Sequence, residues 1–435
     1  MTTVHTRSSE ERKTESRFRF LKALGPGVVT GAADDDPSGI GTYSQAGARL
    51  GFSISWVMIA TYPLMFAIQE ISARIGRTTG KGIASNIREH YPVWLLRSLV
   101  ALLFTANVTN IGADLAAMGD ALKLLIGGSS LIYVILFGAG CVAAQILLDY
   151  ESYVRFLKWS CLSLFAYVAV LATAKVPWGQ ALKGLLVPSI AWSTDFFTTL
   201  VAITGTTISP YLFFWQAAQE AEEVRTKPER QPLLRHRWQA QSAFARIRAD
   251  TGIGMAFSNL IAIAIIITTA ATLHLNGVTN IESSSQAAEA LKPIAGSFAA
   301  LIFTVGIVGT GLLAIPVLAG SSAYAVWCEA AGWKVGLSRR PQEAIAFYAA
   351  LAISAGIGIG INFTPINPIS ALYWSAVVNG VASVPIMVLL VTLAGQRAVM
   401  GEFAIPASLK LLGWAGAIAM MLAVTGMAVS VLLSL

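Results

Sequence analysis

Apolar stretches long enough to cross a lipid bilayer recur from one end of this chain to the other. A transmembrane helix needs about 20 mainly apolar residues. The sequence is 55% hydrophobic and 12% charged, whereas an ordinary soluble domain is about 25% charged. Because lipid offers no hydrogen-bond partners, such stretches must satisfy their own backbone groups and are predicted to be helices. The chain is therefore predicted to be an all-α, polytopic membrane protein.

Hydropathy divides the chain into eleven predicted spans. They are 22–47, 51–75, 96–126, 131–149, 152–175, 193–220, 250–275, 296–328, 341–361, 367–394 and 407–433. Residues 1–19 are polar and basic and lack the apolar core of a signal peptide. We expect residues 1–19 to form a cytoplasmic tail and residues 20–435 to form one membrane domain.

The distribution of lysine and arginine predicts the orientation of these spans. With the N-terminus inside, 25 of the 30 basic residues fall on the cytoplasmic side and 5 fall outside. Cytoplasmic loops of membrane proteins carry such an excess. Eleven spans then place the C-terminus outside, and we expect the protein in the cell inner (plasma) membrane. The net charge of +7 is accounted for by this topology, so we expect no nucleic-acid partner.

Three consecutive acids interrupt the first span, in the sequence Asp34-Asp35-Asp36-Pro37-Ser38-Gly39. An ionised carboxylate at bilayer depth costs at least ~2.5–3.5 kcal/mol, and such residues face a protein interior or a watery path. Pro37 and Gly39 also break the helix and free backbone carbonyls. A broken membrane helix with acids at its break is typical of a cation site in a transporter.

A second break is predicted in the sixth span, at Gly205-Thr206-Thr207-Ile208-Ser209-Pro210. Two interrupted spans, five helices apart, indicate an inverted repeat. The first repeat would cover about 22–175, the second about 193–394, and the helix at about 407–433 would be an addition. The alternative is that Pro210 is an ordinary kink in a packed helix.

The two breaks offer oxygen ligands alone. Asp36 supplies a carboxylate, Thr206 a carbonyl, and Ser209 a hydroxyl, whereas neither break contains methionine, cysteine or histidine. Oxygen ligands suit hard cations such as magnesium, calcium or manganese, and sulfur or imidazole favours softer metals. We expect a hard divalent cation here.

Several motifs resemble those of the Nramp family of divalent-metal transporters over nearly the whole chain. They are Gly25-Pro26-Gly27 followed by Asp36-Pro37; Gln69-Glu70-Ile71-Ser72-Ala73-Arg74-Ile75-Gly76 with Thr79-Gly80-Lys81; Asp114-Leu115-Ala116; and Gly205-Thr206-Thr207-Ile208-Ser209-Pro210. The resemblance implies a LeuT-type fold of eleven transmembrane helices, with a 5+5 inverted repeat and broken helices 1 and 6.

The chain departs from the family pattern at its metal-binding positions. Gly39 stands where the family usually has asparagine, and Ser209 where it has methionine. Tyr211 and Gln216 occupy the usual histidine positions, and Ala117 replaces an acid. This pattern is similar to the Nramp-related magnesium transporters. The resemblance implies a roomier, all-oxygen site for a partly hydrated magnesium ion, because magnesium gives up its waters reluctantly.

From these features we predict a transporter of magnesium, and also of manganese, that works by alternating access. The predicted metal ligands are Asp36, Thr206, Ser209, Gly39, Asp35 and Asn379. Proton coupling is expected to be absent because no histidine, the residue suited to carry protons near neutral pH, lies at a break. We expect a monomer in the lipid bilayer, no enzymatic activity, and no resident cofactor besides the transported ion.

Several alternatives remain open at this stage. Asp36 could simply cap the helix that restarts after the break. Asn107, Asn110 and Asp114 share one helix face and could either line a water path or bridge helices. Tyr211 and the aromatic residues after it could line the inward path or pack in the core. The rival functions are a proton-coupled manganese or iron symporter, a LeuT-type transporter of a small organic solute, and a metal sensor.

Overall fold

The computed structural model describes residues 26–147, 164–173, 175–329, 331–333, 336–365 and 367–434, and these ranges contain helices and no strand. The predicted tail at 1–19 and the first part of the fifth predicted span lie outside these ranges. The longer helices are α2 (Pro26–Asp34), α3 (Pro37–Leu50), α4 (Trp56–Thr79), α6 (Val93–Ile126), α7 (Ser130–Leu147), α9 (Phe165–Thr173), α11 (Thr194–Thr207), α12 (Pro210–Thr226), α13 (Ala240–Thr272), α16 (Ala299–Ser322), α17 (Ile345–Ile361), α18 (Pro368–Gly395) and α20 (Ala407–Ser434).

The long helices have the length and composition of membrane spans. Seven helices in the described part of the chain qualify by these measures, or eight if the bent pair Pro37–Ile54 and Trp56–Thr79 counts as one span. α20 exposes Leu411, Leu422 and Leu432, as a helix that faces lipid would. The all-helical, multi-pass class is therefore confirmed, and the count of eleven spans stays a prediction.

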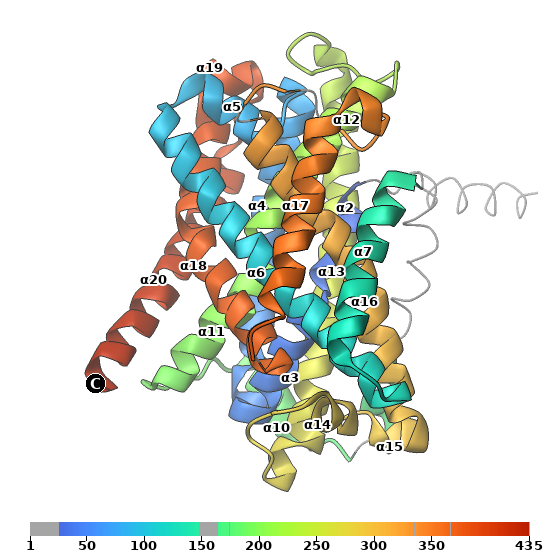
Figure 1. The fold of residues 1–435 in the computed structure, drawn as a ribbon. Coiled ribbons are helices and arrows are strands. Elements are labelled where there is room, and N and C mark those ends of the chain that lie inside the picture. Colours follow the sequence, from blue (N-terminus) through green and yellow to red (C-terminus); the bar gives the residue numbers. More distant parts are fainter. Residues whose placement is uncertain are drawn as a thin grey trace, which may run out of the picture.

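Short helices gather at the two ends of the bundle (Figure 1). α5 (Ile83–His90) and α19 (Arg397–Met400) lie at one end, and α10 (Trp178–Leu186), α14 (Ser284–Glu289) and α15 (Lys292–Ala295) lie at the other. The predicted topology places successive connections on opposite sides of the membrane, and each group of short helices comes from connections on one side. This arrangement agrees with spans that cross the bundle in alternating directions.

Both predicted breaks are present. α2 ends at Asp34 and α3 begins at Pro37, while α11 ends at Thr207 and α12 begins at Pro210. In each case proline occupies the first helical position, where its missing N–H costs nothing. The broken helices also lie together, since α3 contacts α11 and α2 contacts α12. The bundle therefore brings two distant breaks into one buried region.

Two helices extend further than hydropathy predicts. α13 begins at Ala240, ten residues before the predicted start at 250, and α12 runs to Thr226 rather than to 220. The extensions carry charged residues, which lower hydropathy without disfavouring a helix. Arg246 in the α13 extension pairs at 2.5 Å with Glu220, where the predicted span ends, and lies 3.9 Å from Glu223 in the α12 extension, so its charge is satisfied by a tertiary contact.

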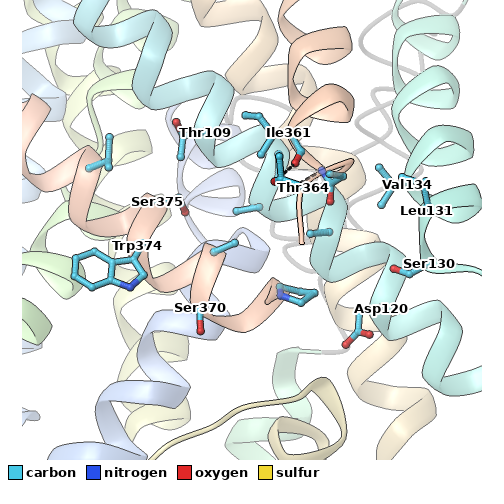
Figure 2. A pocket seen from close by; sticks show the side chains of 17 residues that line it. Thr109, Asp120, Ser130, Leu131, Val134, Ile361, Thr364, Ser370, Trp374 and Ser375 are labelled. Carbon is cyan, nitrogen blue, oxygen red and sulfur yellow. Dashed lines mark hydrogen bonds between the residues drawn. The ribbon is translucent and has the colours of Figure 1, made fainter. Parts of the chain in front are cut away.

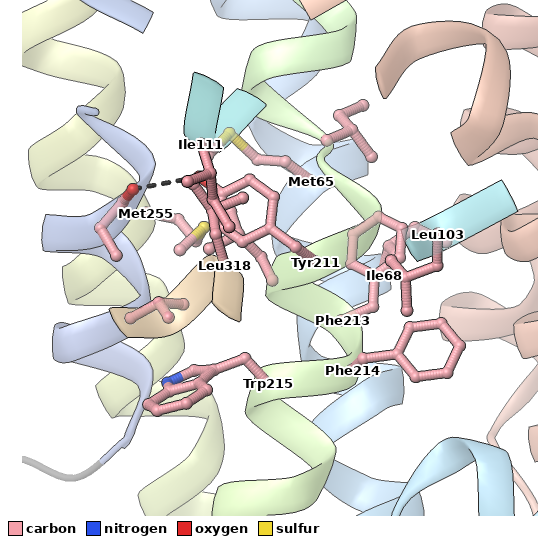
Figure 3. Close-up of a cluster of buried hydrophobic side chains, with 14 of the residues drawn as sticks. Met65, Ile68, Leu103, Ile111, Tyr211, Phe213, Phe214, Trp215, Met255 and Leu318 are labelled. Carbon is pink, nitrogen blue, oxygen red and sulfur yellow. Dashed lines mark hydrogen bonds between the residues drawn. The ribbon is translucent and has the colours of Figure 1, made fainter. Parts of the chain in front are cut away.

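An aromatic cluster on α12 belongs to the core. Phe213, Phe214 and Trp215 are at most 2% exposed, and Figure 3 shows them among apolar side chains of other helices, including Leu103 and Leu318. These three residues pack rather than line an open path. Tyr211, at the start of the same helix, differs because its hydroxyl reaches the first break.

Candidate functional site

Asp36 lies at the first break with its carboxylate fixed from both sides. It is the N-cap of α3, and its Oδ1 accepts a hydrogen bond of 2.6 Å from the backbone N–H of Gly39. Its Oδ2 accepts hydrogen bonds from the Asn110 amide at 2.9 Å and from the Tyr211 hydroxyl at 3.3 Å. The residue is 1% exposed. The capping interpretation is thus confirmed, and capping also orients the second oxygen toward α6 and α12.

A chain of amides and carboxylates extends from Asp36 into α6 and α18. The Asn110 amide also donates to Asp114 Oδ2 at 3.1 Å, and Asn379 of α18 donates to Asn110 Oδ1 at 3.1 Å. The backbone N–H of Ser38 donates to Asp114 Oδ1 at 3.1 Å. One amide therefore joins two buried carboxylates, and α3, α6 and α18 are coupled at the break.

The second break presents backbone and hydroxyl oxygens close to the first. A Cβ atom at position 39 would lie 3.3 Å from Thr206 Oγ1 and 3.1 Å from the carbonyl oxygen of Asp34. The hydroxyl of Ser209 donates to the carbonyls of Gly205, at 2.7 Å, or Thr206, at 2.8 Å. Ser209 thus satisfies its own helix end, whereas Thr206 faces α3.

Asp34 and Asp35 point to a different helix from Asp36. The hydroxyl of Ser258 on α13 lies 2.5 Å from Asp34 Oδ2 and 3.1 Å from Asp35 Oδ1. Both acids are at most 1% exposed, and Ser258 is fully buried. The three consecutive acids are therefore divided between two groups of partners.

The structure brings together Asp36, Gly39 and Thr206, and links Asn379 to them through Asn110. Asp35 lies with Ser258 instead, and Ser209 turns back on its own helix. Sequence reasoning missed the contacts of Tyr211 and Ser258. Tyr211 follows Pro210 directly, and this position was a usable signal, but Ser258 is one of many small polar residues in apolar helices and gave none.

The polar residues on one face of α6 could line a path or bridge helices, and the structure assigns them different contacts. Asn107 donates to the hydroxyls of Ser321 and Ser322 at 2.7 and 2.9 Å and so bridges α6 and α16. Asn110 and Asp114 instead contact the first break. One face of α6 thus combines a helix bridge with part of the candidate site.

The donors at the breaks differ from a conventional metal cluster. Within the described ranges no three His, Cys, Asp or Glu side chains converge in a way that would hold a metal. A bound ion would take carbonyl, amide and hydroxyl oxygens around Asp36, which are ligands for hard cations. Gly39 was expected to leave a larger ion site, but this space is not seen, because atoms of the two breaks already pack against the position that a Gly39 side chain would occupy. The site is shut in this conformation.

A cavity of about 470 Å³ lies beside the site, between α6, α7, α17 and α18 (Figure 2). Its wall includes Asp120, Trp374 and Ser375. The Ser375 hydroxyl is 3.0 Å from that of Ser38, which follows the first break. The cavity thus reaches the back of α3, and Asp36 is not part of its lining.

These features define a membrane protein with two broken helices that enclose buried carboxylates, the architecture of a secondary transporter. The family model described as "Natural resistance-associated macrophage protein-like" matches residues 27–430. The chain therefore belongs to the Nramp family.

Known proteins similar to this chain agree with this assignment. The "Divalent metal cation transporter MntH" of Yersinia pestis (strain Pestoides F) is 28% identical over 302 residues, which cover 67% of this chain and 69% of that protein. The crystal structure of the Eremococcus coleocola manganese transporter, in complex with an aromatic bis-isothiourea substituted compound, superposes with a TM-score of 0.70 at 16% identity, covering 97% of this chain and 88% of that one. MhsT in complex with L-phenylalanine gives a TM-score of 0.60 at 13% identity, covering 92% and 98%. The LeuT-type fold is confirmed.

Proposed function

We propose that this chain imports divalent metal cations, with magnesium as the main cargo and manganese as a second one. Membership of the family and the names of its relatives support divalent-cation transport. The observation that carries magnesium is the set of residues around Asp36, namely Thr206, Asn110, which donates to the Asp36 carboxylate, and Asn379, which donates to Asn110. Each of these side chains carries an oxygen, and none is a sulfur or imidazole ligand. Magnesium binds through one or two carboxylates and keeps several waters.

Alternating access is supported by the contacts that close the site at each end. Toward the end that carries α10, α14 and α15, Arg49 of α3 pairs with Asp195 of α11 at 3.2 Å and lies over the Tyr373 ring of α18 at 5.4 Å. Toward the opposite end, Glu220 of α12 pairs with Arg246 of α13 at 2.5 Å. Release of one closure at a time would open the breaks to one side only.

Opening is also what would admit a hydrated ion. Gly39 places no side chain between Asp36 and Thr206, so separation of α3 from α11 would leave space for water directly over the carboxylate. Asp36 would remain oriented by the Gly39 N–H throughout. The protein would hold the cation with one fixed carboxylate oxygen, and amides and water would fill the remaining positions.

The import would run in the plasma membrane with the N-terminus inside and without coupled protons. An inside-negative potential contributes about 2.3 kcal/mol per charge per 100 mV, so a divalent cation needs no further driving force to enter. His90, His236 and His274 all lie near helix ends, away from the breaks. The chain would act as a monomer in the lipid bilayer, with the ion as cargo rather than as a resident cofactor.

The test is magnesium flux into proteoliposomes that contain a trapped magnesium dye and, in parallel, a trapped pH dye. We expect wild-type uptake without acidification, and loss of uptake in Asp36→Ala. Asp120→Asn is the matched control because this carboxylate lines the cavity outside the site, and it should transport normally. Manganese uptake with no magnesium uptake would contradict the proposal.

A proton-coupled manganese or iron symporter is the second candidate. Asp114 favours it, because a second carboxylate joined to Asp36 through Asn110 could accept a proton when the cation binds. In this case the pH dye would report acidification during uptake, and Asp114→Asn would abolish the acidification. Cadmium would also compete strongly with the cargo.

A further inference from the structure

A second, smaller cavity lies where α3, α11 and α18 meet at the end of the bundle that carries α10, α14 and α15 (Figure 1). Its volume is about 170 Å³, and its wall includes Gln45 of α3, Thr198 of α11 and Tyr373 of α18. Gln45 lies nine residues after Asp36, at the first break. Thr198 lies eight residues before Thr206, at the second break. A helix rises about 1.5 Å per residue, which places this outer cavity roughly 12–14 Å from both breaks, on the outer side in the proposed orientation.

One cationic side chain occupies the outer cavity. Among the described residues that line it, Arg49 is the only cation and Asp195 is the only anion. The Arg49 guanidinium lies 3.2 Å from the Asp195 carboxylate and donates to Asn280 Oδ1 at 3.4 Å. It also lies 5.4 Å from the centre of the Tyr373 ring, within the range of a cation–π contact. A carboxylate, an amide oxygen and a ring face, from three separate segments, thus surround a single positive charge.

The neutral groups around Arg49 are held by contacts of their own. The side-chain oxygen of Asn280 accepts a hydrogen bond of 2.7 Å from Gln45, whose own oxygen accepts one of 2.9 Å from the backbone N–H of the residue after Asn280. The Tyr373 hydroxyl lies 2.9 Å from that of Thr199 on α11. None of these contacts involves Arg49. The groups that favour a cation would therefore stay in place if Arg49 moved away.

Arg49 itself is held weakly and can be replaced by another cation. The side chains of Arg49 and Asp195 are 26% and 68% exposed, and ion pairs this exposed contribute little to stability. A divalent cation carries twice the charge of Arg49, and its waters can donate to the amide and hydroxyl oxygens of the wall. The outer cavity has room for such an ion with its waters, since a single water requires a cavity of only about 10–15 Å³.

We propose that the outer cavity is a docking site for a hydrated divalent cation, and that Arg49 occupies it as a tethered cation until an external ion displaces it. Asp195 attracts ions from the medium, as an acid in a cleft does, and Arg49 competes with them. Once displaced, Arg49 no longer joins α3 to α11, so that the arrival of the ion also releases the outer closure. The inference rests on the proposed transport through Asp36 and describes the step that precedes it.

The two partners of this ion pair are therefore expected to act in opposite directions. The experiment measures initial magnesium uptake into intact cells that express the full-length chain and contain a magnesium dye, because only the outer end then faces the medium. We expect Arg49→Gln to lower the magnesium concentration for half-maximal uptake by about fivefold and Asp195→Asn to raise it by about fivefold, since each removes one unit charge near a divalent ion. The double variant should return close to the wild-type value. This concentration does not depend on how much folded protein each cell contains.

Two further variants separate the charge of Arg49 from its shape and from the general charge of this end. Arg49→Lys keeps the positive charge without the planar guanidinium, and it should stay within about twofold of wild type. Lys292→Gln removes a positive charge from the same end of the bundle, where Lys292 forms an exposed pair with Glu289 at 2.8 Å outside the outer cavity. It should leave the half-maximal concentration unchanged.

The outcomes separate this inference from the proposed function. Shifts in the same direction in Arg49→Gln and Asp195→Asn would mean that the pair only locks the closed state, and they would overturn the docking site while transport through Asp36 stands. Unchanged values in both variants, or equal values in Arg49→Lys and Arg49→Gln, would overturn it as well. Absence of magnesium uptake in the wild type, or full uptake in Asp36→Ala, would instead overturn the proposed function.

Discussion

The two breaks in this bundle use their polar groups in opposite ways. At the first break the side chains reach out to other helices, since Asp36 contacts α6 and α12 while Asp34 and Asp35 contact α13. At the second break the Ser209 and Thr207 hydroxyls return to carbonyls of α11. The first break therefore gathers charge and couples helices, and the second stabilises its own ends and offers mainly its backbone. A cation would be held by the first break and enclosed by the second.

The largest expected effect comes from removal of the charge at the first break. Asp36→Asn keeps the shape of the side chain and removes the carboxylate that would hold the ion. We expect magnesium uptake to fall by at least about 100-fold, beyond the 10–100-fold typical of a residue that only supports a ligand. Proteoliposome flux measures this. Uptake within threefold of wild type would remove Asp36 from the transport site.

The next effect concerns the amide that joins the carboxylates. Asn110→Ala removes the hydrogen bonds to Asp36 and Asp114, and we expect about a tenfold rise in the magnesium concentration for half-maximal uptake. Asn107→Ala is the control one turn earlier on α6. It breaks a bridge to α16, so it should lower thermal stability and leave this concentration unchanged. Equal effects on transport in both variants would assign Asn110 a structural role.

A smaller effect is expected where the two breaks approach each other. Gly39→Ala would place a Cβ atom 3.3 Å from Thr206 Oγ1, and such overpacking costs about 1–3 kcal/mol. We expect several-fold slower magnesium uptake, with manganese less affected because it gives up its waters more readily. Gly356→Ala on α17, where the added atom meets open space, should transport normally. Faster magnesium uptake in Gly39→Ala would contradict the role of space over Asp36.

The smallest effect is expected at the second break itself. Ser209→Ala removes a hydroxyl that bonds its own helix, and such a bond contributes about 0.5–1.5 kcal/mol to stability. We expect a slightly lower unfolding temperature and uptake within threefold of wild type. Thr207→Ala, which loses a similar bond to α11, serves as the control. A large loss of uptake in Ser209→Ala alone would identify this hydroxyl as a ligand. Both breaks would then bind the ion through side chains, contrary to the difference described above.

Much of the fold could be predicted from the sequence because its determinants are local. Apolar length predicted the helices, and proline predicted where both broken helices restart, at Pro37 and Pro210. The ends of helices were predicted less well wherever tertiary contacts satisfy charged residues. α13 begins ten residues early, and this extension carries Arg246, whose charge is neutralised by Glu220 of another helix. No local pattern reveals that partner.

The sequence by itself determined that Asp36 lies at a break, that the donors there are oxygens, and that the chain resembles a metal-transporter family. Only the tertiary structure decided where each side chain of the acidic run points. Adjacent residues at a break project in different directions, so Asp36 meets Asn110, 74 residues later, while Asp35 meets Ser258, 223 residues later. These pairings depend on which helices pack side by side. Packing is decided by close contacts such as that of Gly31 with Gly254, which a linear sequence does not display.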